Sequence, residues 1–69
     1  MERKNEIDRI KNEALSTYNK DRKIEVIDTL ATYGKDGVSP IMDIVNSTAN
    51  NDVKSHALQT IRKINEKFR

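Results

Sequence analysis

With 69 residues, the chain has room for one small domain, which we take to span residues 1–69. Its 13 basic and 11 acidic side chains nearly cancel, which argues against nucleic acid as the main partner. There is no cysteine, which excludes disulfides, thiolate metal sites and a thiol nucleophile. No apolar run approaches the ~18 residues of a membrane span, and the first residues lack the apolar core of a signal peptide. We therefore expect a cytoplasmic protein with no membrane partner.

The first predicted helix covers residues 3–17. Ile7, Ile10, Ala14 and Tyr18 recur at helical spacing, and charged side chains crowd the opposite face. The pattern predicts an amphipathic helix whose apolar stripe, with Tyr18 at its end, faces a core.

The second predicted helix begins after Asp21 and ends at Gly34. The Asp21 carboxylate is a candidate N-cap, because it can accept hydrogen bonds from the amides of the first turn. Glycine is the residue type expected where a helix ends in a left-handed conformation. The apolar residues of this helix are Ile24, Val26, Ile27, Leu30, Ala31 and Tyr33.

The last two helices are predicted to start near Asp36 and at Asp52, which are further N-cap candidates. Pro40 falls in the first turn of the third helix, where its missing amide costs nothing. The breaks at residues 19–20 and 49–51 are short, so neighbouring helices should be antiparallel. The expected apolar residues are Val38, Ile41, Ile44 and Val45 in the third helix and Val53, Ala57, Leu58, Ile61, Ile64 and Phe68 in the fourth.

The chain repeats itself. Residues 16–23 (STYNKDRK) are echoed by residues 47–54 (STANNDVK), and the apolar positions that follow each octet also align. We call the spacing from Ser16 to Ser47 the repeat offset. Repetition at a period of roughly 20–50 residues is typical of solenoids. The sequence therefore predicts an all-α fold in which two antiparallel helical hairpins, residues about 3–34 and 36–68, stack side by side.

The second to fourth helices resemble the short HEAT-like repeat found in bilin lyases and many archaeal and bacterial proteins. The resemblance is carried by a polar triplet at a helix start, an apolar ladder, a glycine turn and a proline that opens the next helix. The chain departs from the family pattern at Arg22, where the second repeat has the apolar Val53. It also has two repeats, fewer than the three or so usually needed for independent stability. The resemblance implies a short HEAT-like α-solenoid that acts as an interaction module. The matching residues are Asp21, Arg22, Lys23, Val26, Leu30, Tyr33, Gly34, Val38, Ser39, Pro40, Ile41, Ile44, Val45, Asn51, Asp52, Val53, Lys54, Ala57, Leu58, Ile61 and Ile64.

At the repeat offset, Asp21 aligns with Asp52 and Lys23 aligns with Lys54. These charged pairs allow two interpretations. In HEAT-like arrays such residues often bridge adjacent repeats, which would bring Asp21 close to Lys54. Alternatively, Asp21 and Asp52 are helix caps while Lys23 and Lys54 are solvated. Both interpretations are structural and neither indicates an activity.

No constellation of residues indicates catalysis. His56 is the only histidine, and its neighbours on the polar side of the fourth helix are not metal ligands. Ser39 and Ser47 lack a histidine partner at plausible spacing, and there is no glycine-rich phosphate loop. We therefore expect no enzymatic activity, no catalytic, metal-binding or cofactor-binding residue, no cofactor and no small-molecule substrate.

The polar faces of the second and fourth helices are the predicted partner-binding surface. In HEAT-like solenoids the second helix of each hairpin lines the concave, binding side. The second helix offers acidic side chains there and the fourth offers basic ones, a division that suits a protein partner or another copy of the chain. The alternative is an ordinary solvated surface. The candidate residues are Glu25, Asp28, Thr29, Thr32, His56, Gln59, Thr60, Lys63 and Lys67.

The sequence thus predicts a small HEAT-like protein–protein interaction or adapter module. Self-association is open as well, because two repeats leave apolar edges that a third would bury. The second function that we consider is nucleic-acid binding through the basic C-terminal helix. Its basic residues point in different directions around the helix, and there is no aromatic platform for stacking bases.

Overall fold

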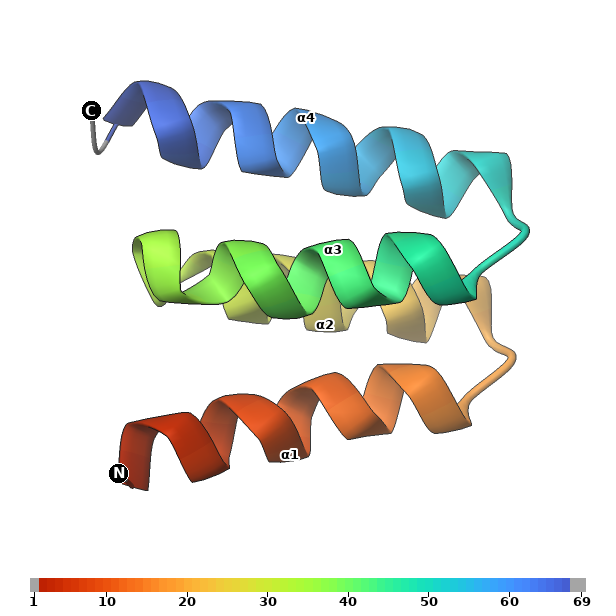
Figure 1. The fold of residues 1–69 in the computed structure, drawn as a ribbon. Helices are drawn as coiled ribbons and strands as arrows, with labels where there is room; N and C mark the ends of the chain where they lie inside the picture. The colour runs from red at the N-terminus through yellow and green to blue at the C-terminus, as the bar shows by residue number, and fades with distance from the viewer. Residues whose placement is uncertain (1, 68–69) are drawn as a thin grey trace.

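The computed structural model describes residues 2–67 and, within them, the side chains of residues 5–67. This part of the chain folds into α1 (Glu2–Ser16), α2 (Lys20–Ala31), the short 3-10 helix η1 (Gly34–Gly37), α3 (Val38–Ser47) and α4 (Asn51–Lys67) (Figure 1). No strand occurs between residues 2 and 67. The predictions of an all-helical chain with four α-helices are therefore confirmed for the described residues. Phe68, which is among the apolar residues assigned to the fourth predicted helix, lies outside them.

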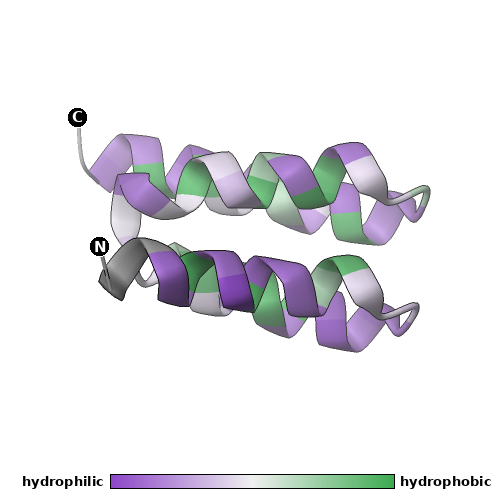
Figure 2. Cartoon of the chain, turned by 60° about the horizontal axis from the view of Figure 1, so that its bottom comes forward, coloured by the Kyte–Doolittle hydropathy of each residue, from purple (hydrophilic) through white to green (hydrophobic). Residues whose placement is uncertain are grey.

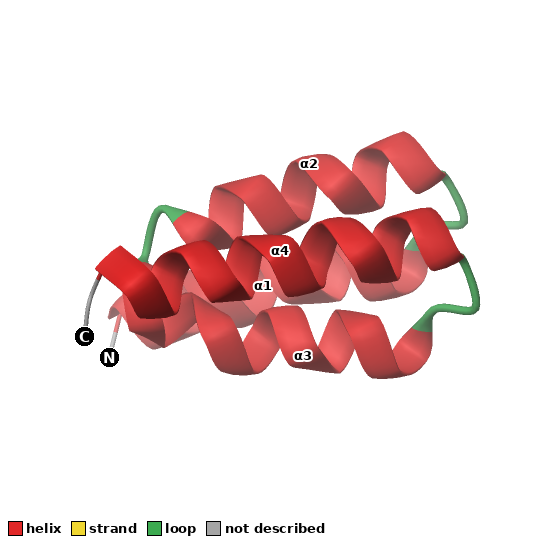
Figure 3. Cartoon of the chain, turned by 90° about the horizontal axis from the view of Figure 1, so that it is seen from above, coloured by secondary structure: helices red, strands yellow, loops and turns green. Residues whose placement is uncertain are grey.

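In the view of Figure 1, α2 and α3 lie between α1 and α4. Seen from above, α4 overlies α1, and α2 and α3 lie on either side of them (Figure 3). Contacts join α1 to both α2 and α3, and α4 to the same two helices. Helices consecutive in the chain run in opposite directions, so α1 is parallel to α3 and α2 is parallel to α4 (Figure 1). Each helix shows hydrophilic and hydrophobic stretches in alternation along its ribbon, as amphipathic helices do (Figure 2).

Apolar side chains from all four helices meet in one core. The largest fully buried side chains include Ile27 and Leu30 of α2 and Ile41 and Ile44 of α3. Helical spacing in the sequence places these residues on one face of each helix, and burying such faces is the main stabilising term for a small domain. The buried apolar residues are Ile7, Ala14, Val26, Ile27, Leu30, Ile41, Ile44, Val53, Ala57 and Ile64.

Two predicted apolar positions do not belong to this core. Tyr18 is fully exposed, because α1 ends at Ser16 and Tyr18 stands in the connection to α2. The prediction that Tyr18 ends a buried stripe is therefore wrong. Leu58 of α4 is 50% exposed although it aligns with the buried Ile27.

The connections α1–α2 and α3–α4 have the same hydrogen bonds at positions related by the repeat offset. The Thr17 hydroxyl accepts from the amide of Asn19 at 3.2 Å, and Thr48 does the same for Asn50 at 3.2 Å. Each asparagine side chain then accepts from an amide in the first turn of the next helix, that of Arg22 or Val53, at 3.1 Å. The repeated sequence therefore produces a repeated local structure.

These bonds show that the caps of α2 and α4 are Asn19 and Asn50 rather than Asp21 and Asp52. The predicted caps were wrong by two residues, because the asparagine carbonyl sits where the first-turn amides converge. Asp21 instead lies inside the first turn, where a negative charge is favourable near the positive end of the helix dipole.

Two predictions about the passage from α2 to α3 are confirmed and one is wrong. Gly34 has a φ of 67°, the left-handed conformation predicted for it, although α2 ends earlier, at Ala31, with Thr32 as its cap. Pro40 is in the first turn of α3, also as predicted. The helix does not start near Asp36, however, because residues 34–37 form the 3-10 turn η1 and α3 begins at Val38.

Gly37, the cap of α3, lies against the backbone of α2. A Cβ atom at this position would lie 2.0 Å from the Leu30 carbonyl oxygen. Only glycine therefore allows the turn to approach α2 this closely.

Candidate functional site

Within the described residues, three ion pairs connect the first repeat to the second. Lys11 of α1 meets Asp43 of α3 at 3.3 Å, and Lys20 of α2 meets Asp52 of α4 at 3.5 Å. The third joins His56 of α4 to a carboxylate of α2. All involve partly exposed groups, whose contribution to stability is usually below about 1 kcal/mol.

Neither interpretation of the aligned charges is right in full. The salt bridges between described residues include none from Asp21 to Lys54, and Lys20 rather than Asp21 reaches across to α4. Lys23 is also not solvated: it is buried, and its ammonium donates a 3.0 Å hydrogen bond to the carbonyl oxygen of Ala14 near the end of α1. Burying a charged group requires such a partner. Lys23 therefore ties α2 to α1.

A groove of about 340 Å³ runs between α2 and α4, and we call it the α2–α4 groove. Both helices contribute side chains to it, which their parallel, adjacent placement makes possible. Ala31 and Ile64 give it an apolar part, and polar or charged groups stand around them. The lining residues are Asp28, Ala31 and Thr32 of α2 and His56, Thr60, Lys63, Ile64 and Lys67 of α4.

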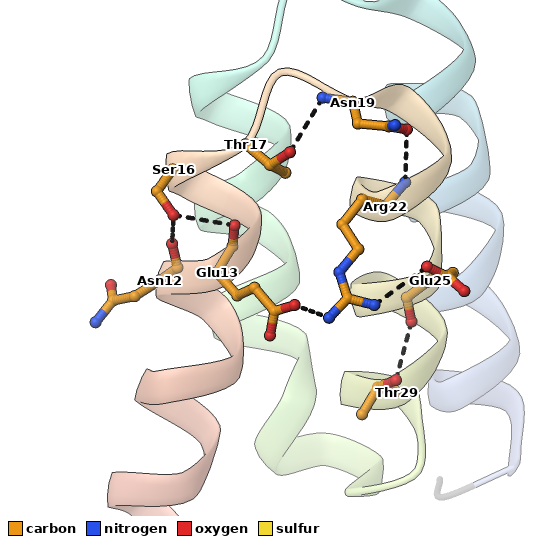
Figure 4. A network of polar contacts seen from close by, with 8 residues as sticks. All are labelled: Asn12, Glu13, Ser16, Thr17, Asn19, Arg22, Glu25 and Thr29. Carbon is orange, nitrogen blue, oxygen red and sulfur yellow. Dashed lines mark hydrogen bonds and ion pairs between the residues drawn. The ribbon is translucent and has the colours of Figure 1, made fainter.

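Six of the nine candidate residues line the α2–α4 groove: Asp28, Thr32, His56, Thr60, Lys63 and Lys67. The structure does not bring Glu25, Thr29 and Gln59 to it. Glu25 accepts a 3.2 Å hydrogen bond from Arg22, which also pairs with Glu13 of α1, so Glu25 belongs to a network at the α1–α2 edge (Figure 4). The Thr29 hydroxyl donates to the Glu25 carbonyl oxygen at 3.0 Å. Gln59 is exposed on α4.

Sequence reasoning missed Ala31 and Ile64 as groove residues. Both were assigned only to apolar stripes, whereas each also borders the opening between the helices. The signal was present in the sequence, since Ala31 adjoins the candidate Thr32 and Ile64 adjoins the candidate Lys63. Which apolar residues of a helix border the solvent depends on how the helix is rotated when it packs against its neighbours.

His56 and Asp28 form a polar contact across the groove. The His56 Nε2 atom lies 2.7 Å from the Asp28 Oδ1 atom, and the two side chains are 35% and 60% exposed. His56, which the sequence places on the polar side of its helix, is half-buried and paired. The contact ties one oxygen of the Asp28 carboxylate to α4.

The two threonine hydroxyls of the groove both donate hydrogen bonds to backbone carbonyl oxygens. Thr60 donates to the His56 carbonyl oxygen at 2.8 Å, and Thr32 donates to that of Thr29 at 2.7 Å. Neither hydroxyl shares a hydrogen bond with the His56 ring, as an activated nucleophile would. Among the described residues there is also no group of three or more histidine, aspartate or glutamate side chains that could hold a metal ion.

A second hollow, of about 310 Å³, lies at the end of the molecule where the two equivalent connections meet. Apart from two lysines, its lining holds no charged group and no histidine. The lining residues are Leu15, Thr17, Tyr18, Lys20, Lys23, Ser47, Thr48, Ala49 and Asn50.

No helix in the described part of the chain is both long and apolar enough to cross a membrane. Comparisons of the chain with protein-family models, with curated proteins and with solved structures found no match. The function must therefore be argued from the geometry alone.

Proposed function

We propose that the chain is a small HEAT-like interaction module without catalytic activity, and that it binds a protein partner along the α2–α4 groove. The observation that carries this proposal is the groove itself, which joins six of the nine residues predicted for binding from two separate helices. A rigid helical surface of this kind loses little conformational entropy on docking.

The HEAT-like part of the proposal is supported by the internal repeat. Asn19 and Asn50, which are related by the repeat offset, make the same hydrogen bonds, and the helices that follow them lie side by side. A two-repeat solenoid would have both properties.

The charges of the groove favour a partner segment with acidic side chains. The lining holds two lysines, Lys63 and Lys67, against the single carboxylate of Asp28, and the apolar Ala31 and Ile64 lie among them. Complementary charge of this kind contributes mainly to specificity and association rate. An acidic, partly apolar protein segment therefore fits the groove better than a sugar or a neutral metabolite does.

The test is a charge reversal in the groove. Affinity capture from a cell extract compares the natural chain, the double variant Lys63→Glu/Lys67→Glu, and a matched control, Arg9→Glu/Lys35→Glu, at exposed positions outside the groove. A protein retained by the natural chain and by the control, but lost from the groove variant, supports the proposal. If the groove variant captures the same proteins, the proposed surface is wrong, provided that circular dichroism shows unchanged helicity.

Nucleic-acid binding is tested separately with a labelled DNA duplex. Counterion release makes such binding fall steeply with salt, in proportion to the number of phosphates contacted. Duplex binding that is steep in salt and abolished by Lys63→Glu/Lys67→Glu would replace the protein partner by a nucleic acid.

A further inference from the structure

The internal repeat identifies a second surface, on the side of α4 away from α2. Ile27 is fully buried, whereas its equivalent in the second repeat, Leu58, is 50% exposed. The same holds for Leu30, which is fully buried, and its equivalent Ile61, which is only partly buried. Apolar residues at equivalent positions thus differ in exposure but not in kind.

The difference has a structural cause. Equivalent residues have the same surroundings within their own repeat, so the covering of Ile27 must come from the neighbouring repeat, through α3 and α4. Among the described residues, no further helix stands beside α4 in the way that α4 stands beside α2. Leu58 and Ile61 therefore occupy positions that a following hairpin would cover.

The opposite side of the molecule, at the α1–α2 edge, has charged side chains at the equivalent positions. The second repeat presents buried Ile44 and Val53 toward the first, and the equivalent residues of the first repeat are Glu13 and Arg22. These two form an ion pair across the α1–α2 edge, extended by Glu25 (Figure 4). At these positions a stacked hairpin would meet charged rather than apolar side chains. Growth of the stack is therefore favoured beyond α4, where Leu58 is exposed.

The charged side chains beside Leu58 determine which kind of partner can dock on this side of α4. In the α2–α4 groove, Ala31 and Thr32 of α2 stand opposite Lys63 and Lys67 of α4. The repeat offset places Arg62 and Lys63 where Ala31 and Thr32 stand in the first repeat. A second copy of the whole chain would present its α1–α2 edge, with Glu13 and Arg22, because the inner face of its own second repeat is buried against its first repeat. A hairpin with the sequence of residues 34–67, stacked in the same way, would bring its own Lys63 and Lys67 against Arg62 and Lys63. Like charges at such distances oppose association.

We propose that Lys54, Leu58, Ile61 and Arg62, which we call the outer face of α4, are the docking site for a helical hairpin of a different protein. That hairpin would have an apolar inner face, like that of residues 38–67, and acidic side chains opposite Arg62 and Lys63. The four residues of the outer face do not line the α2–α4 groove, and the two sites adjoin at Lys63.

The test uses two synthetic probes and the full chain. One peptide has the natural sequence of residues 34–67, and the other is the same peptide with Lys63→Glu and Lys67→Glu, which supplies the required acids. Fluorescence anisotropy measures the binding of each labelled peptide to the full chain. We expect the acidic peptide to bind at least tenfold more tightly, with an affinity that falls as salt is raised.

Leu58→Glu in the full chain should abolish binding of the acidic peptide, whereas Leu15→Glu should leave it unchanged. Leu15 is a matched control, because it is a leucine of similar exposure (41%) on α1. Equal binding of both peptides, or equal binding to the Leu58→Glu and Leu15→Glu variants, would overturn the proposal. So would a stable dimer of the natural chain that Leu58→Glu dissociates, because a second copy would then be the occupant.

A second experiment does not require the isolated peptide to fold, because the hairpin is joined covalently to the chain. Residues 34–67, in natural or acidic form, are appended after Ile64, which keeps the repeat offset and raises the effective concentration of the hairpin. We expect the acidic extension to add helicity and raise the urea midpoint, and Leu58→Glu to cancel both gains. An acidic extension that stays unfolded would refute the proposed docking site.

Discussion

Replacing Leu30 by alanine is the most direct test of the core. Leu30 is fully buried, and the nearby η1 turn approaches its backbone so closely that Gly37 has no space for a side chain. The surroundings therefore have little freedom to collapse into the space that a truncated side chain leaves. Truncation of a buried leucine costs ~2–5 kcal/mol, with the larger losses at sites that relax least.

That loss is large for a domain of this size. At ~0.05–0.15 kcal/mol per residue, the whole chain is expected to be stable by only about 3–10 kcal/mol. Leu30→Ala should therefore lower the melting temperature by at least ~8–16 °C, since each kcal/mol shifts it by ~4–8 °C in a small domain. If the natural chain is stable by only about 3 kcal/mol and the loss exceeds that value, the variant would be largely unfolded at 25 °C.

Urea denaturation followed by circular dichroism at 222 nm gives the free energy of unfolding. Leu58→Ala is the matched control, because Leu58 is half exposed and its truncation removes little buried area. We expect a small loss, below about 1 kcal/mol, for the control. A loss under about 0.5 kcal/mol for Leu30→Ala would refute the placement of Leu30 in the core.

Two further changes test the caps and the turn. Asn50→Ala should destabilise the chain by ~0.5–2 kcal/mol, because it removes the acceptor for the amides of Asp52 and Val53, while Asp52→Ala should cost less; equal losses in urea denaturation would contradict Asn50 as the cap. Gly37→Ala should lower the thermal midpoint, because the new Cβ would meet the Leu30 carbonyl oxygen at 2.0 Å; an unchanged midpoint would contradict this close approach.

The helices themselves could be predicted from local patterns. Apolar residues at helical spacing located all four helices, and the positive φ of Gly34 and the first-turn position of Pro40 followed from the chemistry of those two residue types. The ends were less accurate. Asn19 and Asp21 are both good caps by composition, and only the course of the preceding Thr17 connection selects between them.

The candidate site was predicted in part. Choosing the polar side of two helices was enough to find Asp28, His56 and Lys63, because a groove between neighbouring helices collects residues from both. It was not enough to exclude Glu25, whose carboxylate turns to Arg22 at the other edge of α2. Helical spacing gives the directions of side chains relative to one another, but not which direction faces a neighbouring helix. The rotation of each helix is therefore known only once its neighbours are placed.

The sequence by itself determined the elements and their repetition, because helix spacing, turn chemistry and the repeat offset can be read along the chain without knowing what packs where. Only the tertiary structure decided the exposure of each position. Ile27 and Leu58 are equivalent in the sequence, yet one is buried by a neighbouring repeat and the other is not. Burial depends on what packs against a residue from elsewhere in the chain, and no local pattern records that.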